Sequence, residues 1–571
     1  MKLFKYFALV VMGALISGCA AEVEDVQPTT NGTVTMKTTI SLSEQASTRA
    51  LTEAGVKTFA AGDKIAVIYK NTNDETMKVV SAALTTDDID ATDAHKATFS
   101  VSLTNPKAST PVRYIYPASR AAENVATTTA PNDDATIKYD VLATQVGTFD
   151  KIASDLDLSV FDGDMTAQAV LPAATLTNPL TIAKFTIKNG DGTSDLTSTI
   201  TGLTINDGTN TYAITRTAAA GPIYVAMKPI AGTKTVTVDA TDGTNNYTKS
   251  VSGNALAASS IYTITVKALK KIDLSQITAA YTAQNGEVLT GTLDVDNYPV
   301  KISIADGATV TLNGLTINGT HANDDAHKHA GITCEGDATI ILADGSINTV
   351  RGFNNNYPGI LVGGTGTTLT INAETEGTGI LNVTGGSNGA AGIGTGYVTS
   401  VSTQQGGNIT ISGGKVTSQG GEKAAGIGTG YSFMGNSQCG NITIKGGEVT
   451  AQGGESAAGI GTGYIFNGTS QCGNITIEAS VICVKAKRGQ YGHYSIGRGH
   501  SYSTAPHTIG TITFGTAQVY DGTGGTGGTD TWDASINFNV DGNYGPFGGL
   551  NLAISTETNA NDTWTLTPVA P

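Results

Sequence analysis

A tandem repeat of about 33 residues, lying between residues 379 and 477, restricts the folds open to this chain more than any other feature. The block Asn-Ile-Thr-Ile starts at Asn408, Asn441 and Asn474, in two steps of 33 residues. Each block follows a segment rich in glycine and small residues. A fixed period of this length is typical of stacked supersecondary units, each of which contacts mainly its neighbours.

An isoleucine in a small-residue context extends the pattern on both sides of the central repeats. The steps between successive isoleucines are 28, 33, 34, 33 and 36 residues, so the middle is regular and the ends are degenerate. Short strands, two or three per unit, alternate with glycine pairs. We predict a parallel β-helix of about six rungs over residues 269–515 and a C-terminal cap over residues 516–571. The six isoleucines are Ile332, Ile360, Ile393, Ile427, Ile460 and Ile496.

The remaining sequence predicts an all-β protein of several domains. The chain has 571 residues, of which 6% are aromatic, 14% are charged and 71 are glycine. Within residues 32–268, apolar and polar residues alternate in short runs such as 64–69 and 180–187, the pattern of half-buried strands. We predict two β-sandwich domains, over residues 32–155 and 156–268. The net charge of −15 argues against nucleic-acid binding, which needs clustered lysines and arginines.

The N-terminus has the pattern of a secreted lipoprotein. Two lysines precede an apolar run over residues 7–16, which is too short to span a bilayer. The last two residues of this run begin the sequence Leu-Ile-Ser-Gly-Cys, which looks like a bacterial lipobox with Cys19 as the lipidated residue. We expect residues 1–18 to be removed, and Cys19 with a tether over residues 19–31 to anchor the protein in the bacterial outer membrane.

Acidic residues follow the expected lipidation site, at Glu22, Glu24 and Asp25. This patch resembles the surface-export signal of Bacteroidetes lipoproteins, so we expect the protein at the cell surface. Two plainer alternatives stay open: an ordinary signal peptide with an incidental cysteine, and a tether that is acidic because disordered segments often are.

The order of motifs over residues 32–268 resembles the Bacteroidetes fimbrillin-like family. The resemblance implies two transthyretin-like β-sandwich domains in a protein that builds or decorates fimbriae or sits on the surface as a lipoprotein. It covers under half of the chain. The motifs are Thr48-Arg49-Ala50, Phe59 to Ile65, Tyr114 to Pro117, Leu180 to Phe185, Ile223 to Pro229 and Ile261 to Ile264.

The family resemblance also implies a processing site. Fimbrial subunits of this kind are cut by an arginine-specific protease after an early strand, and a neighbouring subunit then adds a strand in its place. Arg49 is the only arginine among the first hundred residues, so cleavage would leave Ala50 at the N-terminus. The alternative is an ordinary loop arginine. Some 300 residues follow the second sandwich, which favours a tip or accessory subunit over a repeating shaft subunit.

Aromatic residues recur at equal phase in the repeat and are the candidate ligand or partner surface. A row of aromatic side chains can stack on sugars or grip a protein partner. The alternative is a ladder that packs the intervening loop. The candidates are Tyr397, Tyr431 and Tyr464, with Phe433 and Phe466 two residues after the last two tyrosines.

Two further groups of residues leave alternatives open. Cys439 and Cys472 lie 33 residues apart, so they are either stacked thiols or a disulfide. Two histidine clusters, His321 to His329 and His493 to His507, are either polar loops or metal ligands, and we predict no metal site. The glycine-rich Gly-x-Gly string recurs and has no helix after it, so we interpret it as structural, and we predict no cofactor.

The charges in the repeat argue against an enzyme. Between residues 379 and 477 there is neither Asp nor Arg, whereas β-helical glycosidases and lyases need carboxylate pairs or carboxylates with a basic residue. We therefore expect a non-catalytic fimbrillin-like surface protein, a fimbrial tip or accessory subunit or an adhesin, whose partners are other subunits, glycans or host surface proteins. The alternative is a polysaccharide-binding surface lipoprotein without a fimbrial role. Third is a β-helical carbohydrate-active enzyme.

Overall fold

The computed structural model describes most of the chain, in twelve segments. No helix in these segments is long and apolar enough to cross a membrane. The described residues are 27–28, 32–42, 58–139, 141–293, 300–319, 327–375, 377–492, 494–502, 507–515, 517–520, 538–541 and 563–568. They fall into two compact units that meet in sequence near residue 266, the first holding two β-sandwiches and the second a β-helix.

The first sandwich packs two sheets around one apolar core. Alternation along the strands places Phe99, Val101 and Leu103 of one sheet, and Val67, Tyr69 and Tyr114 of the other, in this core. One sheet contains β1 (Gln27–Pro28), β2 (Thr33–Leu42), β5 (Lys96–Thr104) and β9 (Ala174–Leu176). The other contains β3 (Ala66–Lys70), β4 (Thr76–Val80), β6 (Pro111–Tyr116) and β8 (Ser159–Asp164).

The second sandwich follows the same principle. Its core includes Ile182, Phe185, Leu203 and Val225, all at most 2% exposed. One sheet contains β10 (Thr181–Asn189), β13 (Ile223–Met227) and β16 (Ser260–Asp273). The other contains β7 (Thr144–Gln145), β11 (Gly202–Asn206), β12 (Thr211–Thr215), β14 (Lys234–Thr241) and β15 (Asn246–Gly253), and the short helix α1 (Phe149–Asp155) follows β7.

The two sandwiches divide later than the boundary expected at residues 155/156. β8 pairs with β6 from Ser159 to Asp164, and β9 pairs with β2 through residues 174–176, so both strands complete the first sandwich. Conversely, β7 lies before that boundary but pairs with β12 of the second sandwich. The chain therefore visits the second sandwich, returns to the first, and enters the second again at Thr181.

The second unit is a parallel β-helix, which confirms the prediction made from the repeat. The six isoleucines named above are register partners, each paired with the next. The stack that contains these isoleucines begins two strands before the strand of Ile332. It has eight strands in the described chain. These are β17 (Tyr281–Ala283), β19 (Ile302–Ile304), β21 (Ile332–Cys334), β24 (Ile360–Leu361), β27 (Ile393–Gly394), β31 (Ile427–Gly428), β35 (Ile460–Gly461) and β39 (Ile496–Gly497).

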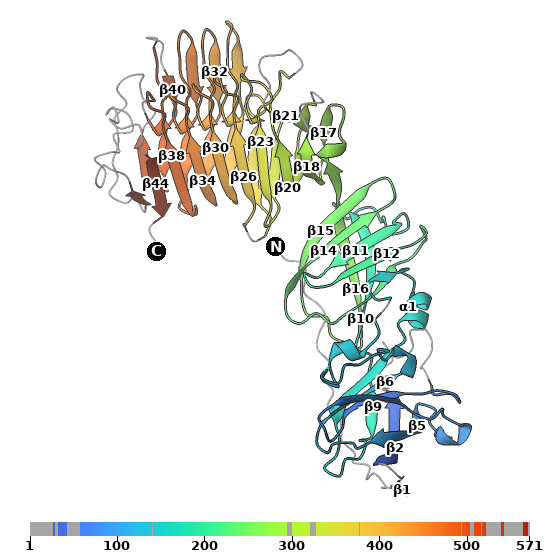
Figure 1. Cartoon of the computed structure of the whole chain (residues 1–571). Helices are drawn as coiled ribbons and strands as arrows, with labels where there is room; N and C mark the ends of the chain where they lie inside the picture. The colour runs from blue at the N-terminus through green and yellow to red at the C-terminus, as the bar shows by residue number, and fades with distance from the viewer. Residues whose placement is uncertain are drawn as a thin grey trace. The chain divides into compact units, whose positions relative to one another are not determined.

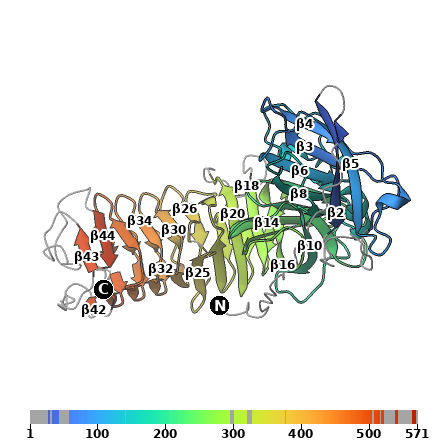
Figure 2. The same cartoon turned by 90° about the horizontal axis from the view of Figure 1, so that it is seen from below.

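Each central repeat contributes four strands, whereas the sequence predicts two or three. Two stacks run side by side along the β-helix and are continuous in Figures 1 and 2. They share β18 (Glu287–Leu293) and β20 (Ala308–Ile317). One continues through β22 (Ala338–Leu342), β25 (Thr368–Ala373), β29 (Asn408–Ile411), β33 (Ile442–Ile444), β37 (Ile475–Ile477) and β41 (Ile512–Phe514). The other continues through β23 (Ile347–Arg351), β26 (Ile380–Thr384), β30 (Lys415–Gln419), β34 (Glu448–Gln452) and β38 (Cys483–Lys487).

Within the described residues, the additional stack has four strands, all in the later rungs. Its interior positions are Ser437 and Cys439 in one repeat and Ser470 and Cys472 in the next, at most 6% exposed. Because serine does not mark a core position by hydropathy, the apolar pattern alone did not reveal these strands. They are β28 (Thr403–Gln405), β32 (Asn436–Cys439), β36 (Thr469–Cys472) and β40 (His507–Ile509).

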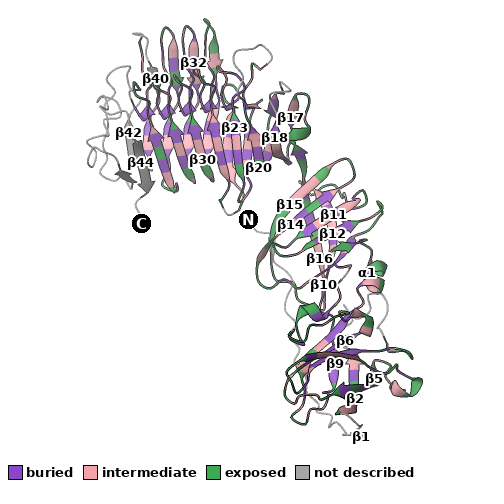
Figure 3. Cartoon of the chain, in the orientation of Figure 1, coloured by how far each residue is buried: buried purple, intermediate pink, exposed green. Residues whose placement is uncertain are grey.

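The interior of the β-helix is built from like residues stacked on like. Buried positions recur at matching places along successive strands, as the purple bands of Figure 3 show. Antiparallel strands lie at the C-terminal end. β42 (Ala517–Tyr520) pairs with β41, and β44 (Thr563–Pro568) pairs with β38 and with β43 (Phe538–Asp541). These strands lie in the expected cap.

Glycine is required where the Ile-Gly strands end. Gly428 has φ +134°, and a Cβ on this residue would lie 1.9 Å from the carbonyl oxygen of Gly461 in the next rung. Gly394 and Gly461 repeat this geometry. The glycines of the Gly-x-Gly string are therefore corners at which successive backbones meet closely.

Gly428→Ala is expected to destabilise the β-helix by about 2–6 kcal/mol. Backbone strain contributes about 1–3 kcal/mol and the steric conflict about as much again. Gly364→Ala is the matched control in the same β-helix, because a Cβ there would meet nothing within 4 Å, and its cost is expected to be at most about 0.5 kcal/mol. Guanidinium unfolding followed by circular dichroism measures both. Equal midpoints would contradict the close approach.

Candidate binding surface

The aromatic residues of the repeat lie on one corner of the β-helix, after the Ile-Gly strands. Isolated parallel bridges join Val398 to Ser432, Ser432 to Ile465 and Ile465 to Ser501. These bridges keep the corners of four successive rungs in phase. Side chains that flank the bridge residues are therefore stacked along the β-helix.

The tyrosines on the N-terminal side of these bridges form one continuous ladder, which we call the inner ladder. The ring centroids of Tyr397 and Tyr431 are 4.6 Å apart, and those of Tyr431 and Tyr464 are 5.1 Å apart. His500 continues the ladder at 5.5 Å from Tyr464, with an interplanar angle of 11°. Such offset stacks stabilise neighbouring rungs beyond the area that they bury.

The protein itself covers Tyr431 of the inner ladder, whereas Tyr397, Tyr464 and His500 are half-buried. Tyr431 is 6% exposed, and burial raises its pKa. Its backbone N–H donates to the carbonyl oxygen of Gly389, and a Cβ on Gly389 would come within 2.6 Å of the Tyr431 Cβ. The Lys423 Nζ lies 5.4 Å from the Tyr431 ring centroid. These contacts are those of a ladder that packs the loops between strands, and they leave little of Tyr431 for a ligand.

A second ladder, the outer ladder, follows two residues later in each rung and is more exposed. Phe433 and Phe466 stack at 5.1 Å, and Phe466 and Tyr502 at 5.5 Å, with interplanar angles of 16° and 12°. Phe466 is 39% exposed and Tyr502 is 73% exposed. Met434, beside Phe433, is 43% exposed. The outer ladder is therefore an apolar strip that faces solvent increasingly toward the C-terminal rung.

Sequence reasoning missed the last member of each ladder, His500 and Tyr502. The last step of the isoleucine series is 36 residues, and adding 36 to Tyr464 and Phe466 gives these two positions. The signal was therefore present in the spacing. It was obscured because the final rung replaces tyrosine by histidine and phenylalanine by tyrosine.

Uncharged polar side chains lie on the strands next to the ladders. Gln405, Gln438 and Gln471 are register partners on β28, β32 and β36. Gln405 and Gln471 are exposed and Gln438 is half-buried. Amide side chains carry both donors and acceptors. The aromatic corner of each rung is thus followed in the chain by a strand of the amide row.

The cysteine pair is in register and reduced. Cys439 and Cys472 face each other across adjacent strands, and both are free thiols. The sulfhydryl groups lie 3.9 Å from the carbonyl oxygens of Gly407 and Gly440, respectively. The hydrogen bond with Cys439, and burial, raise the pKa of Cys472. The stacked-thiol alternative is the one that the structure shows.

The remaining candidate residues are placed as follows. Cys19, Arg49 and Ala50 lie outside the described residues. Of the first histidine cluster, His329 packs 4.3 Å from the Phe353 ring, and burial lowers its pKa. Within the described segments there is no group of three or more His, Cys, Asp or Glu side chains placed to hold a metal ion.

Comparison with known proteins finds the β-helix repeat. The family model described as a beta helix repeat matches residues 409–431 and 442–464, which are successive repeats. These two segments begin in β29 and β33 and run through the corner to the inner-ladder tyrosines. No curated protein matches the chain.

Solved structures similar to this chain include proteins of Parabacteroides and Bacteroides named for fimbriae or adhesion. A fimbrial assembly protein from Parabacteroides distasonis is 12% identical, with a TM-score of 0.23, covering 41% of this chain and 90% of that one. A protein from Bacteroides ovatus, named as a candidate for cell adhesion, is 14% identical, with a TM-score of 0.23, covering 42% and 93%. A similarly named protein from Bacteroides uniformis is 17% identical, with a TM-score of 0.22, covering 41% and 93%.

The buried thiols are expected to resist alkylation. Burial raises the pKa of Cys334 to about 12, so at mildly alkaline pH its thiolate fraction lies at least about a hundredfold below that of an ordinary thiol. Cys472 shifts in the same direction, and only the thiolate reacts. Peptide mapping after iodoacetamide treatment should show Cys483, which is half-buried, labelled first. Labelling of Cys334 or Cys472 as fast as Cys483 in the folded protein would contradict this order.

Proposed function

We propose that this protein is a non-enzymatic adhesive protein of the bacterial surface, anchored through lipid on Cys19, whose β-helix carries the binding surface. The observation that carries the proposal is the outer ladder. Phe433, Phe466 and Tyr502 form a row of stacked rings that is half-buried at Phe433 and exposed at Phe466 and Tyr502. Exposed aromatic residues in a row are enriched at binding sites, because they supply a large apolar area with little rotamer freedom to lose.

The backbone of the β-helix supports this assignment. Parallel pairing holds each corner to the rungs before and after it, so the rings are ordered before any partner arrives. Ordering before binding lowers the entropy cost of association. The proposed partners are glycans or host surface proteins.

A polysaccharide-binding role without fimbriae is the second candidate, and the amide row favours it. Gln405, Gln438 and Gln471 lie in register on β28, β32 and β36, and the side chains of Gln405 and Gln471 are exposed. Stacking surfaces with nearby amides suit sugar rings, which have apolar faces and hydroxyl edges. A glycan array and a panel of host surface proteins separate the two candidates.

A fimbrial role as tip or accessory subunit rests on the resemblance of the N-terminal half and on the place of β2. This strand lies inside its sheet, with β5 on one edge and β9 on the other. Cleavage after Arg49 would separate β2 from the rest of the chain. Its removal would open a groove between β5 and β9 that a strand from a fimbrial subunit could fill by main-chain hydrogen bonds.

Replacing two rings of the outer ladder should weaken binding. Phe466→Ser combined with Tyr502→Ser is expected to reduce retention on a glycan array or on host surface proteins by about tenfold or more, since two aromatic anchors together are worth about 2 kcal/mol. Ile347→Ser is the control, because Ile347 is 60% exposed on β23, away from the ladders. Unchanged binding by the double variant, or depolymerisation of a bound polysaccharide by the native protein, would contradict the proposal.

Mass spectrometry of the mature N-terminus tests the anchor and the fimbrial role. Membrane-bound protein is expected to begin at a lipidated Cys19, and Cys19→Ser should release it from the membrane fraction. Protein in sheared fimbriae is expected to begin at Ala50. Finding only the lipidated Cys19 terminus on intact cells would remove the fimbrial part of the proposal and leave the surface-binding part.

A further inference from the structure

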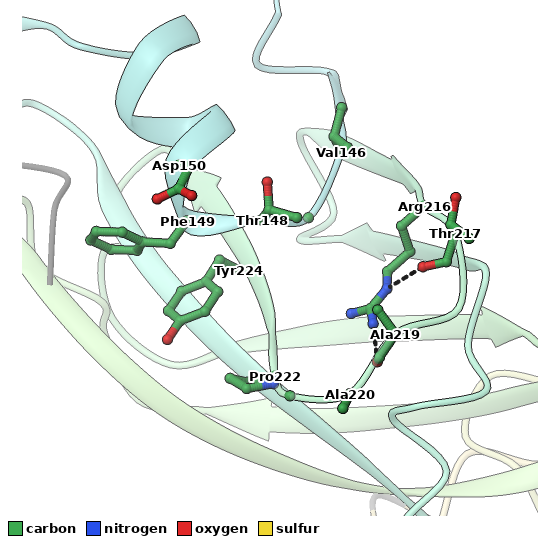
Figure 4. Close-up of a pocket in the computed structure, with 12 residues that line it drawn as sticks. Val146, Thr148, Phe149, Asp150, Arg216, Thr217, Ala219, Ala220, Pro222 and Tyr224 are labelled. Atoms are coloured by element: carbon green, nitrogen blue, oxygen red, sulfur yellow. Dashed lines mark hydrogen bonds between the residues drawn. The ribbon is translucent and has the colours of Figure 1, made fainter.

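The second sandwich contains a pocket that the adhesive function does not use. Its volume is about 600 Å³, and it lies between the first turn of α1 and the loop that joins β12 to β13 (Figure 4). The β-helix contributes no residue to it. The pocket is lined by residues 146–150, 216–217, 219–222 and Tyr224.

Arg216 supplies a positive charge to this pocket. Its Nε donates to the carbonyl oxygen of Thr217 at 3.3 Å, and a terminal nitrogen donates to the carbonyl oxygen of Ala219. These two bonds use two of the five guanidinium N–H donors. Across the described residues, no carboxylate forms an ion pair with Arg216, and burial lowers its pKa. Among the described residues, the side chain is thus a partly desolvated cation without a counter-ion.

The opposite side of the pocket is aromatic, and the Lys184 Nζ lies 5.7 Å from the Tyr224 ring centroid. The rings of Phe149 and Tyr224 meet edge to face, with centroids 5.1 Å apart, and Pro222 lies beside them. In Figure 4 this group lies across the pocket from Arg216. Aromatic walls with one polar group that fixes orientation are typical of small-molecule sites.

Asp150 determines which way an anion could enter. Its carboxylate lies on the side of Phe149, away from Arg216, in Figure 4. A negative charge near Asp150 would be repelled, whereas one near the guanidinium would be attracted. The site therefore favours a ligand with one negative charge at one end and an apolar ring at the other.

We propose that this pocket binds small aromatic monocarboxylates. The carboxylate takes the free N–H donors of Arg216, and the ring packs against Phe149, Tyr224 and Pro222. Thr148 lies between the two ends in Figure 4, and its side chain makes no cap hydrogen bond to α1. The site is independent of the proposed adhesive surface, because it lies in the other compact unit.

Ligand-observed saturation-transfer NMR with the full chain tests the proposal, with phenylacetate as the probe and phenylacetamide as its neutral counterpart. Phenylacetate should bind in the millimolar range and at least about tenfold more tightly than the amide, since hydrogen bonds to a charged group contribute about 1.5–3 kcal/mol. Arg216→Gln should remove this preference.

A second variant is needed because Arg216→Gln could also alter the loop whose carbonyl oxygens Arg216 binds. Asp150→Asn leaves Arg216 and its carbonyl contacts in place, removes the repulsion and should tighten phenylacetate binding by about two- to fivefold, with no effect on the amide. Failure of phenylacetate to bind in the millimolar range, equal binding of acid and amide, or weaker binding by Asp150→Asn would each overturn the proposal. Circular dichroism confirms that both variants are folded.

Discussion

In-register pairing of parallel strands determines the structure of the C-terminal half of this protein. Strand residues of the central repeats pair with counterparts 33 or 34 positions later, so a residue type that recurs in the sequence forms a column in the structure. Isoleucines form an apolar interior, glycines form corners, asparagines bond from rung to rung, and rings form ladders. The Asn408 side chain, for example, accepts from the Asn441 backbone N–H, and Asn441 accepts from Asn474, each at 2.8 Å. These bonds satisfy backbone donors at the turn between two strands.

The sequence was sufficient to predict the β-helix and the phase of its columns. Residues one period of 33 apart become neighbours on adjacent parallel strands, so the period itself indicates stacking. The sequence was not sufficient to predict the additional stack, because Ser437 and Cys439 occupy its interior positions without an apolar signature. Nor could it locate the boundary between the sandwiches. The pairing of Ser159 with Tyr116 is non-local, and nothing in the alternation of β8 shows which of two similar sheets it will join.

For the candidate binding surface, too, the sequence predicts stacking but not exposure. Equal phase correctly predicts that Tyr397, Tyr431 and Tyr464 stack, but exposure depends on how each corner folds over its neighbour. Gly389 lies against Tyr431 and covers it, whereas Phe466, two residues beyond the corresponding tyrosine, extends past that cover. Two columns separated by two residues in sequence therefore have different roles, one in cohesion and one in contact with solvent. The pocket beside α1 had no sequence signature, because only the fold of the second sandwich brings Arg216 and Phe149 to opposite sides of one cavity.

The close meeting of glycines at the corners has a consequence for how such a protein could change over generations. Because each rung fits onto the next through identical corners, a duplicated repeat would fit onto the stack without altering the rungs on either side. Each duplication would add one strand spacing, about 4.8 Å, to the length of the β-helix. It would also add one ring to each ladder, so length and number of contact points would grow together. A slipped copy of about a hundred nucleotides would thus be enough to alter the reach and the valency of the surface in a single event.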